Sequence, residues 1–165
     1  MSMNTSRLAR RIGTRAKWAL LGFGAAVAVA ATVGALGVRG TSAEYAALDR
    51  PSWAPPGWLF GPVWTLLYVM IALAGWLAWR RVGIGAAFWA WVAQLVLNAA
   101  WTPLFFGARR YGAAFAEIVV LWLAIALTVL LFARVSRPAA LLMLPYLAWV
   151  TFAAALNFAI WRLNP

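Results

Sequence analysis

Polar side chains that lie inside long apolar segments are the first candidates for chemistry in this sequence. Gln94 and Asn98 are four residues apart, so they share one face of a helix, and Trp101 and Phe105 continue along that face. An amide in hydrocarbon costs free energy unless it is paired, so both amides should point inward. The spacing leaves two interpretations open: polar contacts between helices, worth about 0.6 kcal/mol each, or the lining of a pocket.

Deeply placed aromatic side chains accompany these amides. The chain has 12 tryptophans, and several lie near the expected ends of apolar segments, where indoles normally form interfacial belts. Trp64, Trp101 and Trp149 lie deeper, together with Tyr68 and Tyr146. A buried indole needs a flat contact for its ring and an acceptor for its N–H. Several such rings at one depth would suit a planar ligand.

Other kinds of chemistry are excluded by composition. The chain has no cysteine and no histidine, so we expect no disulfide, no thiolate nucleophile and no Cys/His metal site. A bound porphyrin would also lack a His or Cys axial ligand to iron, and no cofactor is required. Glu117 is the one acid inside an apolar segment, which makes it a functional candidate by default. Neutralisation by the nearby Arg109 and Arg110 is the alternative explanation.

The elements that must position these side chains are transmembrane helices. The chain is 66% hydrophobic and only 10% charged, whereas a soluble domain carries about 25% charged residues. A spanning helix needs about 20 apolar residues. This predicts an all-α membrane protein, a five-transmembrane-helix bundle, with spans at about 18–38, 58–79, 84–106, 112–132 and 139–161. The first run is longer than the apolar region of a signal peptide, which favours a retained helix.

The segments outside these spans differ in character. Residues 1–17 are polar and basic, and we expect them to form a flexible tail. The connections after the second, third and fourth spans are short, so consecutive helices should be antiparallel neighbours. The long connection 39–57 contains three prolines, which disfavour a helix. It is either a lid over the bundle or an ordinary connector.

Charge predicts the orientation in the membrane. The net charge is +11, but the basic residues are distributed among the segments between apolar runs and do not form one patch. This pattern is typical of a multi-pass protein in contact with lipid, and we expect no nucleic-acid partner. The bias favours a cytoplasmic N-terminus, in the cell membrane of a bacterium. Antiparallel packing then brings the amides and deep rings to the outer half of the bundle, below 39–57.

Three long motifs carry a resemblance to a known family. They are 51–68 (PSWAPPGWLFGPVWTLLY), 94–107 (QLVLNAAWTPLFFG) and 145–164 (PYLAWVTFAAALNFAIWRLN). Over residues 18–164 the chain resembles the TspO/MBR family of tryptophan-rich sensory and translocator proteins. The resemblance implies a five-helix bundle, usually a homodimer, that binds porphyrins and synthetic benzodiazepine-receptor ligands. A metal-free, protoporphyrin-like tetrapyrrole is therefore the expected ligand.

The resemblance also implies a set of ligand-binding residues, and these coincide with the level reached by the depth argument. That agreement favours a pocket over simple polar contacts, with Arg39 or Arg50 available for ligand carboxylates. With the two residues added by the depth argument, Trp101 and Tyr146, the expected site is Trp53, Trp64, Tyr68, Gln94, Asn98, Trp101, Phe105, Tyr146, Trp149 and Ala153.

Three functions follow from this resemblance. The first is a binding and sensing protein that modulates tetrapyrrole or stress physiology. The second is a light-dependent enzyme that degrades porphyrin, in which Trp53 and Trp149 would take part. The third is a transporter, which the lack of an internal repeat disfavours. Phe158 stands where the sterol motif of eukaryotic members has tyrosine, so specific sterol binding should be poor.

Overall fold

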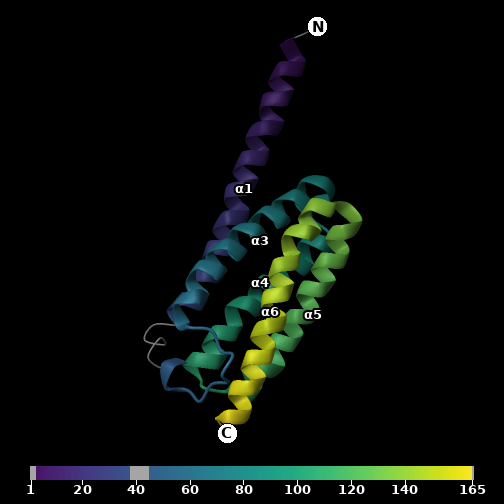
Figure 1. The fold of residues 1–165 in the computed structure, drawn as a ribbon. Helices are drawn as coiled ribbons and strands as arrows, with labels where there is room; N and C mark the ends of the chain where they lie inside the picture. The colour runs from purple at the N-terminus through teal and green to yellow at the C-terminus, as the bar shows by residue number, and fades with distance from the viewer. Residues whose placement is uncertain (1–2, 38–44, 165) are drawn as a thin grey trace.

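The chain folds into a bundle of long helices with no strand among residues 3–37 and 45–164, the part that the computed structural model describes (Figure 1). A 3₁₀ turn, Gly57–Leu59, precedes the second long helix, and a π-helical turn, Pro103–Gly107, follows the third. The long helices are α1 (Met3–Gly37), α3 (Phe60–Val82), α4 (Ala86–Thr102), α5 (Tyr111–Val135) and α6 (Arg137–Leu163).

The lengths of these helices match a bilayer. Four segments among the described residues are long and apolar enough to cross a membrane: Lys17–Leu36, Gly57–Val82, Tyr111–Val135 and Arg137–Leu163. Helix α4 has 17 residues, slightly fewer than the roughly 20 that a span requires. The π-helical turn continues it to Gly107, so the third apolar segment reaches the same end of the bundle as the others.

The first helix differs from the expectation. Residues 3–17, which we expected to form a flexible tail, continue α1 toward the N-terminus. The expectation was based on the absence of an apolar stripe, and a helix that extends beyond its neighbours does not need one. The apolar part of α1 packs against α3 and α4 and buries Phe23, Val27 and Ala30. The expected span is therefore an integral part of the bundle.

The helices form a closed ring rather than a simple succession. Helix α1 packs between α3 and α4, α5 packs between α4 and α6, and α6 completes the ring against α3. Helices α3 and α4, although consecutive, share only minor contacts. In Figure 1 the α3–α4 and α5–α6 junctions lie at the upper end of the bundle, beside α1, while the C-terminus and the segment before α3 lie at its lower end.

The upper half of the bundle is solid. Trp91 of α4 is buried, and its Nε1 donates a 3.0 Å hydrogen bond to the carbonyl oxygen of Ile71. Its ring meets Phe23 of α1 edge-on, with 4.9 Å between centroids. Gly75 of α3 makes this packing possible, because a Cβ at that position would lie 2.6 Å from the indole of Trp91.

Both intramembrane prolines are accommodated without breaking a helix. Pro145 lies inside α6, which runs continuously from Arg137 to Leu163. Pro103 starts the π-helical turn, in which the amide of Ala108 donates to the carbonyl oxygen of Pro103 at 2.8 Å. A π-turn inserts one residue into the helical repeat, so the side chains after Pro103 are rotated relative to those of α4.

Candidate ligand-binding cavity

A cavity of about 380 Å³ lies in the lower half of the bundle, opposite the solid half. All five long helices contribute to its wall, together with Tyr45 and the two helical turns. The lining residues are Ala31, Gly34, Ala35, Tyr45, Gly57, Phe60, Gly61, Trp64, Tyr68, Asn98, Trp101, Thr102, Phe105, Phe106, Ile118, Leu121, Trp149, Val150, Ala153, Leu156, Asn157 and Ile160. None of them carries a formal charge, so the interior suits a largely uncharged molecule.

One wall of the cavity carries a chain of hydrogen bonds across three helices. The Tyr68 hydroxyl of α3 donates to Oδ1 of Asn98 at 3.1 Å. Asn98 of α4 donates in turn, from Nδ2, to the Tyr146 hydroxyl of α6 at 3.0 Å. Both ends of the amide are therefore paired, which explains how an asparagine is tolerated at this depth. The chain also fixes the position of the Tyr68 ring in the cavity wall.

A second asparagine pairs with the next deep indole. Trp101 Nε1 donates to Oδ1 of Asn157 at 3.1 Å, and Nδ2 of Asn157 donates to the carbonyl oxygen of Tyr111 at 3.0 Å. The Trp101 ring stacks on Phe105 with 4.9 Å between centroids. These contacts join α4, α5 and α6 near their lower ends and hold two flat side chains in the wall.

Trp149 is different from the other indoles in the wall. Its Nε1 is buried and has no hydrogen-bond partner among the described residues, although the ring lines the cavity. The ring is held between Phe60, at 5.8 Å between centroids, and Phe152, at 5.4 Å. A buried N–H without an acceptor is costly, so a small rotation of the ring that let a ligand supply an acceptor would be favourable.

Seven of the ten expected site residues line this cavity, and three do not. The seven are Trp64, Tyr68, Asn98, Trp101, Phe105, Trp149 and Ala153. Gln94 is fully buried one turn deeper, where its Nε2 donates to the carbonyl oxygen of Trp91 at 2.8 Å. Tyr146 lies behind the wall as the partner of Asn98. Trp53 is 50% exposed and packs edge-on against Phe152, 5.8 Å away.

Other lining residues were not among the expected ones. Tyr45, from the segment before α3, and Phe60, the first residue of α3, pack edge-on at 5.4 Å between centroids. Asn157 is one turn beyond Ala153 on α6, and this spacing could have identified it. Gly34 brings α1 close to the cavity, since a Cβ there would lie 3.6 Å from the Thr102 hydroxyl.

The lower end of the cavity carries a basic side chain. The Arg50 guanidinium lies over the ring of Tyr45, 4.7 Å from its centroid, and the Tyr45 hydroxyl donates to the carbonyl oxygen of Pro55 at 3.1 Å. Burial raises the pKa of Tyr45, and the adjacent Arg50 opposes that rise. Asn164 ties the segment to α6 through the backbone of Asp49. Arg39 lies outside the described residues.

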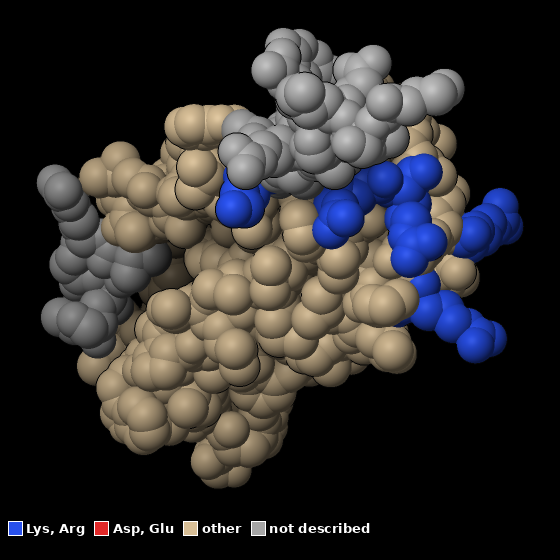
Figure 2. All heavy atoms as spheres, turned by 90° about the horizontal axis from the view of Figure 1, so that it is seen from above, with Lys and Arg blue, Asp and Glu red and all other residues tan. Residues whose placement is uncertain are grey.

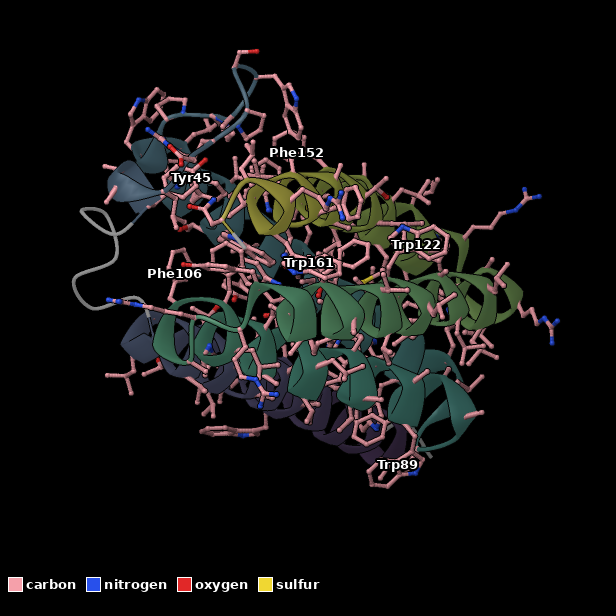
Figure 3. All side chains as sticks on the ribbon, turned by 90° about the horizontal axis from the view of Figure 1, so that it is seen from below. Tyr45, Trp89, Phe106, Trp122, Phe152 and Trp161 are labelled. Atoms are coloured by element: carbon pink, nitrogen blue, oxygen red, sulfur yellow. The ribbon has the colours of Figure 1, made fainter. Side chains whose placement is uncertain are left out.

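This arrangement is one for binding. Among the described residues no group of three potential metal ligands comes together. The cavity instead offers flat aromatic walls, one free indole donor and a guanidinium at its lower end. Figure 3, seen from below, shows Tyr45 at this end and Trp89 on the outer edge of the bundle, far from the cavity. The site would hold a flat, mainly apolar molecule by stacking.

Comparison with known proteins gives consistent matches. The model of the TspO/MBR family matches residues 23–162. The tryptophan-rich protein TspO of Chlorobaculum tepidum is 48% identical over 73% of this chain and 79% of its own length. Protein CrtK of Rhodobacter capsulatus is 41% identical, over 85% and 89% respectively. The human translocator protein is 39% identical over 87% of this chain and 89% of its own length.

Proposed function

The chain belongs to the TspO/MBR family, and from this premise we propose that it binds a porphyrin-type tetrapyrrole in the cavity and acts as a sensory protein of the membrane. The family and the names of its relatives support a sensory or translocator role. That the ligand is a tetrapyrrole is what we propose beyond this role. The observation that carries it is the uncharged, aromatic cavity with one unpaired indole donor.

The shape and chemistry of the cavity favour a flat ligand over a flexible one. The Trp64 and Tyr68 ring centroids lie 5.3 Å apart with the planes tilted by 30°, and Trp101 and Phe105 form a stacked pair. Such walls offer faces on which a planar ring system can stack. The volume of about 380 Å³ is within the range of small-molecule sites, about 300–1,000 Å³. Arg50, at the lower end, would face the carboxylates of the ligand.

The test is a cavity-filling substitution with a matched control on the same helix. Ala153 lines the cavity, whereas Ala155, two residues on, lines a groove on the outside of α5 and α6. Protoporphyrin should quench the tryptophan fluorescence of the purified protein in lipid nanodiscs in a saturable way. Ala153→Phe should abolish saturable quenching, and Ala155→Phe should retain it. Equal quenching in both variants would place the ligand outside the cavity.

A second function is favoured by one contact, and we propose it as the alternative. Trp53 and Trp149 both pack against Phe152, at 5.8 and 5.4 Å between centroids. This ring connects the exposed indole to the one in the cavity, which suits light-dependent degradation of a bound porphyrin. Illumination of the complex should then bleach the porphyrin absorption faster than in Trp53→Phe. Equal bleaching rates in the natural protein and in Trp53→Phe would argue against degradation and leave ligand binding as the function.

The proposed orientation places the N-terminus in the cytoplasm of a bacterial cell. The upper helix ends carry Arg80, Arg81, Arg134 and Arg137. Seen from above, Lys and Arg side chains gather at this face and no acidic side chain is visible (Figure 2). Basic residues remain preferentially on the cytoplasmic side, so the cavity would open toward the opposite side.

A further inference from the structure

Glu117 of α5 is a buried acid that the binding site does not use. Both of its carboxyl oxygens are shielded from solvent, and neither has a hydrogen-bond partner among the described residues. Its neighbours Ile118 and Leu121 line the cavity, but Glu117 itself does not. An ionised carboxylate in an apolar surrounding without a partner is strongly unfavourable, and a neutral acid avoids that cost.

The hydrogen-bond chain of the cavity wall has a direction that ends at Tyr146. Tyr68 donates to Asn98, and Asn98 donates to the Tyr146 oxygen. The Tyr146 hydroxyl accepts this bond, which leaves its own proton for a further acceptor. Asn98 lines the same cavity as Ile118, the residue that follows Glu117. The end of the chain and the unused carboxyl therefore flank one cavity.

We propose that Glu117 is a proton-binding site of the bundle, held as the neutral acid, and that Tyr146, Asn98 and Tyr68 connect it to the cavity. A ligand that contacts Tyr68 or Asn98 alters the hydrogen bonds of Tyr146 and thereby the surroundings of the acid. Among the described residues the titratable groups that flank the cavity in this way are Glu117 on α5, Tyr146 on α6 and Tyr68 on α3. The connection between Glu117 and a bound ligand rests on the proposed function. The protonation of Glu117 does not depend on that function.

Infrared difference spectroscopy on the whole protein in lipid nanodiscs tests the acid. A protonated carboxylic acid has a carbonyl stretching band that carboxylates lack. We expect this band at neutral pH in the natural protein, its loss in Glu117→Gln, and its retention in Asp49→Asn, whose acid lies in the segment before α3. Absence of the band at neutral pH, or its persistence in Glu117→Gln, would overturn the proposal.

A chemical probe keeps the test valid if Glu117→Gln does not fold. A hydrophobic carbodiimide reacts with a neutral carboxyl: the carboxyl oxygen adds to the central carbon and the proton passes to a nitrogen, with no leaving group. Peptide mass spectrometry should find the adduct on Glu117 in the natural protein. A water-soluble carbodiimide should leave Glu117 unmodified. Modification by the water-soluble reagent alone would contradict a buried neutral acid.

The link to the cavity is tested with Tyr146→Phe, which removes the hydroxyl and keeps the ring. The band of the unliganded variant should lie at a different frequency from that of the natural protein, because the proposed connection to the acid has lost its terminal hydroxyl. Protoporphyrin should shift the band in the natural protein and not in Tyr146→Phe. An unchanged unliganded frequency overturns the link. Failure of protoporphyrin to bind would overturn the proposed function and leave the acid standing.

Discussion

At the scale of single residues, asparagines make a cavity possible inside an apolar bundle. Each is paired at both ends of its amide, Asn98 with two tyrosines and Asn157 with an indole and a carbonyl oxygen. Pairing removes the cost of burying an amide and holds the aromatic partners in one orientation. Trp149, whose Nε1 has no partner among the described residues, is the position where a ligand can supply the missing acceptor.

Asn98→Ala should lower the stability of the bundle by about 1–2 kcal/mol. The substitution leaves the Tyr68 and Tyr146 hydroxyls without their partner, which costs more than the average of about 0.6 kcal/mol for a polar contact between membrane helices. Thr151→Val is the control, because Thr151 pairs with Trp122 on the exposed side of α6. Thermal unfolding in detergent measures both. Equal unfolding midpoints for the two variants would show that the buried hydrogen bonds of Asn98 do not add to the stability of the bundle.

Trp149→Phe should weaken porphyrin binding by about 2- to 10-fold without lowering stability. The phenyl ring keeps the stacking surface, and the loss corresponds to one hydrogen bond of about 0.5–1.5 kcal/mol. Stability should remain because the indole N–H has no partner to lose. Titration by fluorescence quenching measures the affinity, with Trp89→Phe on the outer edge as the control. An unchanged affinity would mean that the ligand makes no hydrogen bond with Trp149.

Residue-level interpretation of the sequence named seven residues that line the cavity and missed others, among them Tyr45 and Phe60. Inward-facing amides are predictable because lipid cannot pair with them. Gln94 obeys the same rule only in part, because its Nε2 donates to the carbonyl oxygen of Trp91 while its buried Oε1 has no partner among the described residues. Spacing does not distinguish this outcome from a place in the cavity wall. Tyr45 reaches the cavity from an irregular segment, and Phe60 reaches it from the start of α3; both positions depend on contacts far apart in the sequence.

At the scale of helices, close approach in the upper half depends on small residues opposite large ones. Gly75 of α3 faces Trp91 of α4 and Phe23 of α1. Lengths and apolar character of the spans followed from composition, because the bilayer sets both. The ring order was not predictable, since short connections indicate only which helices can be neighbours, and α3 and α4 are joined by a short connection without packing extensively.

Gly75→Ala should destabilise the bundle by about 1–3 kcal/mol, the usual cost of overpacking. The added methyl group would lie 2.6 Å from the Trp91 ring and 2.9 Å from Phe23, and both rings are held by other contacts. Gly22→Ala is the matched control on α1, because nothing lies within 4 Å of its Cβ. That change should be neutral or slightly stabilising. Midpoints of thermal unfolding that fall equally would refute the packing argument.

At the scale of the whole molecule, the bundle has two unlike ends. The upper end is solid and bordered by arginines, and the lower end contains the cavity and the segment 45–60. The helical continuation of α1 to Met3 was not anticipated from the sequence. All helices share the cavity wall, so the site exists only in the assembled bundle.

The proposed orientation predicts opposite labelling of the two ends. The natural chain has no cysteine, so a maleimide can label this protein only at an introduced cysteine. A membrane-impermeant maleimide should label Ala108→Cys, at the exposed turn before α5, in intact bacterial cells. Val82→Cys, 49% exposed at the upper end, should react only after the cells are opened. The reverse pattern would show that the N-terminus lies outside.

The packed upper half has a consequence for how a ligand can enter. Ile71, Trp91 and Phe132 are buried among the helices and are not part of the cavity lining. A molecule in the cavity therefore meets packed side chains toward the upper end, which leaves the lower half of the bundle for entry and exit.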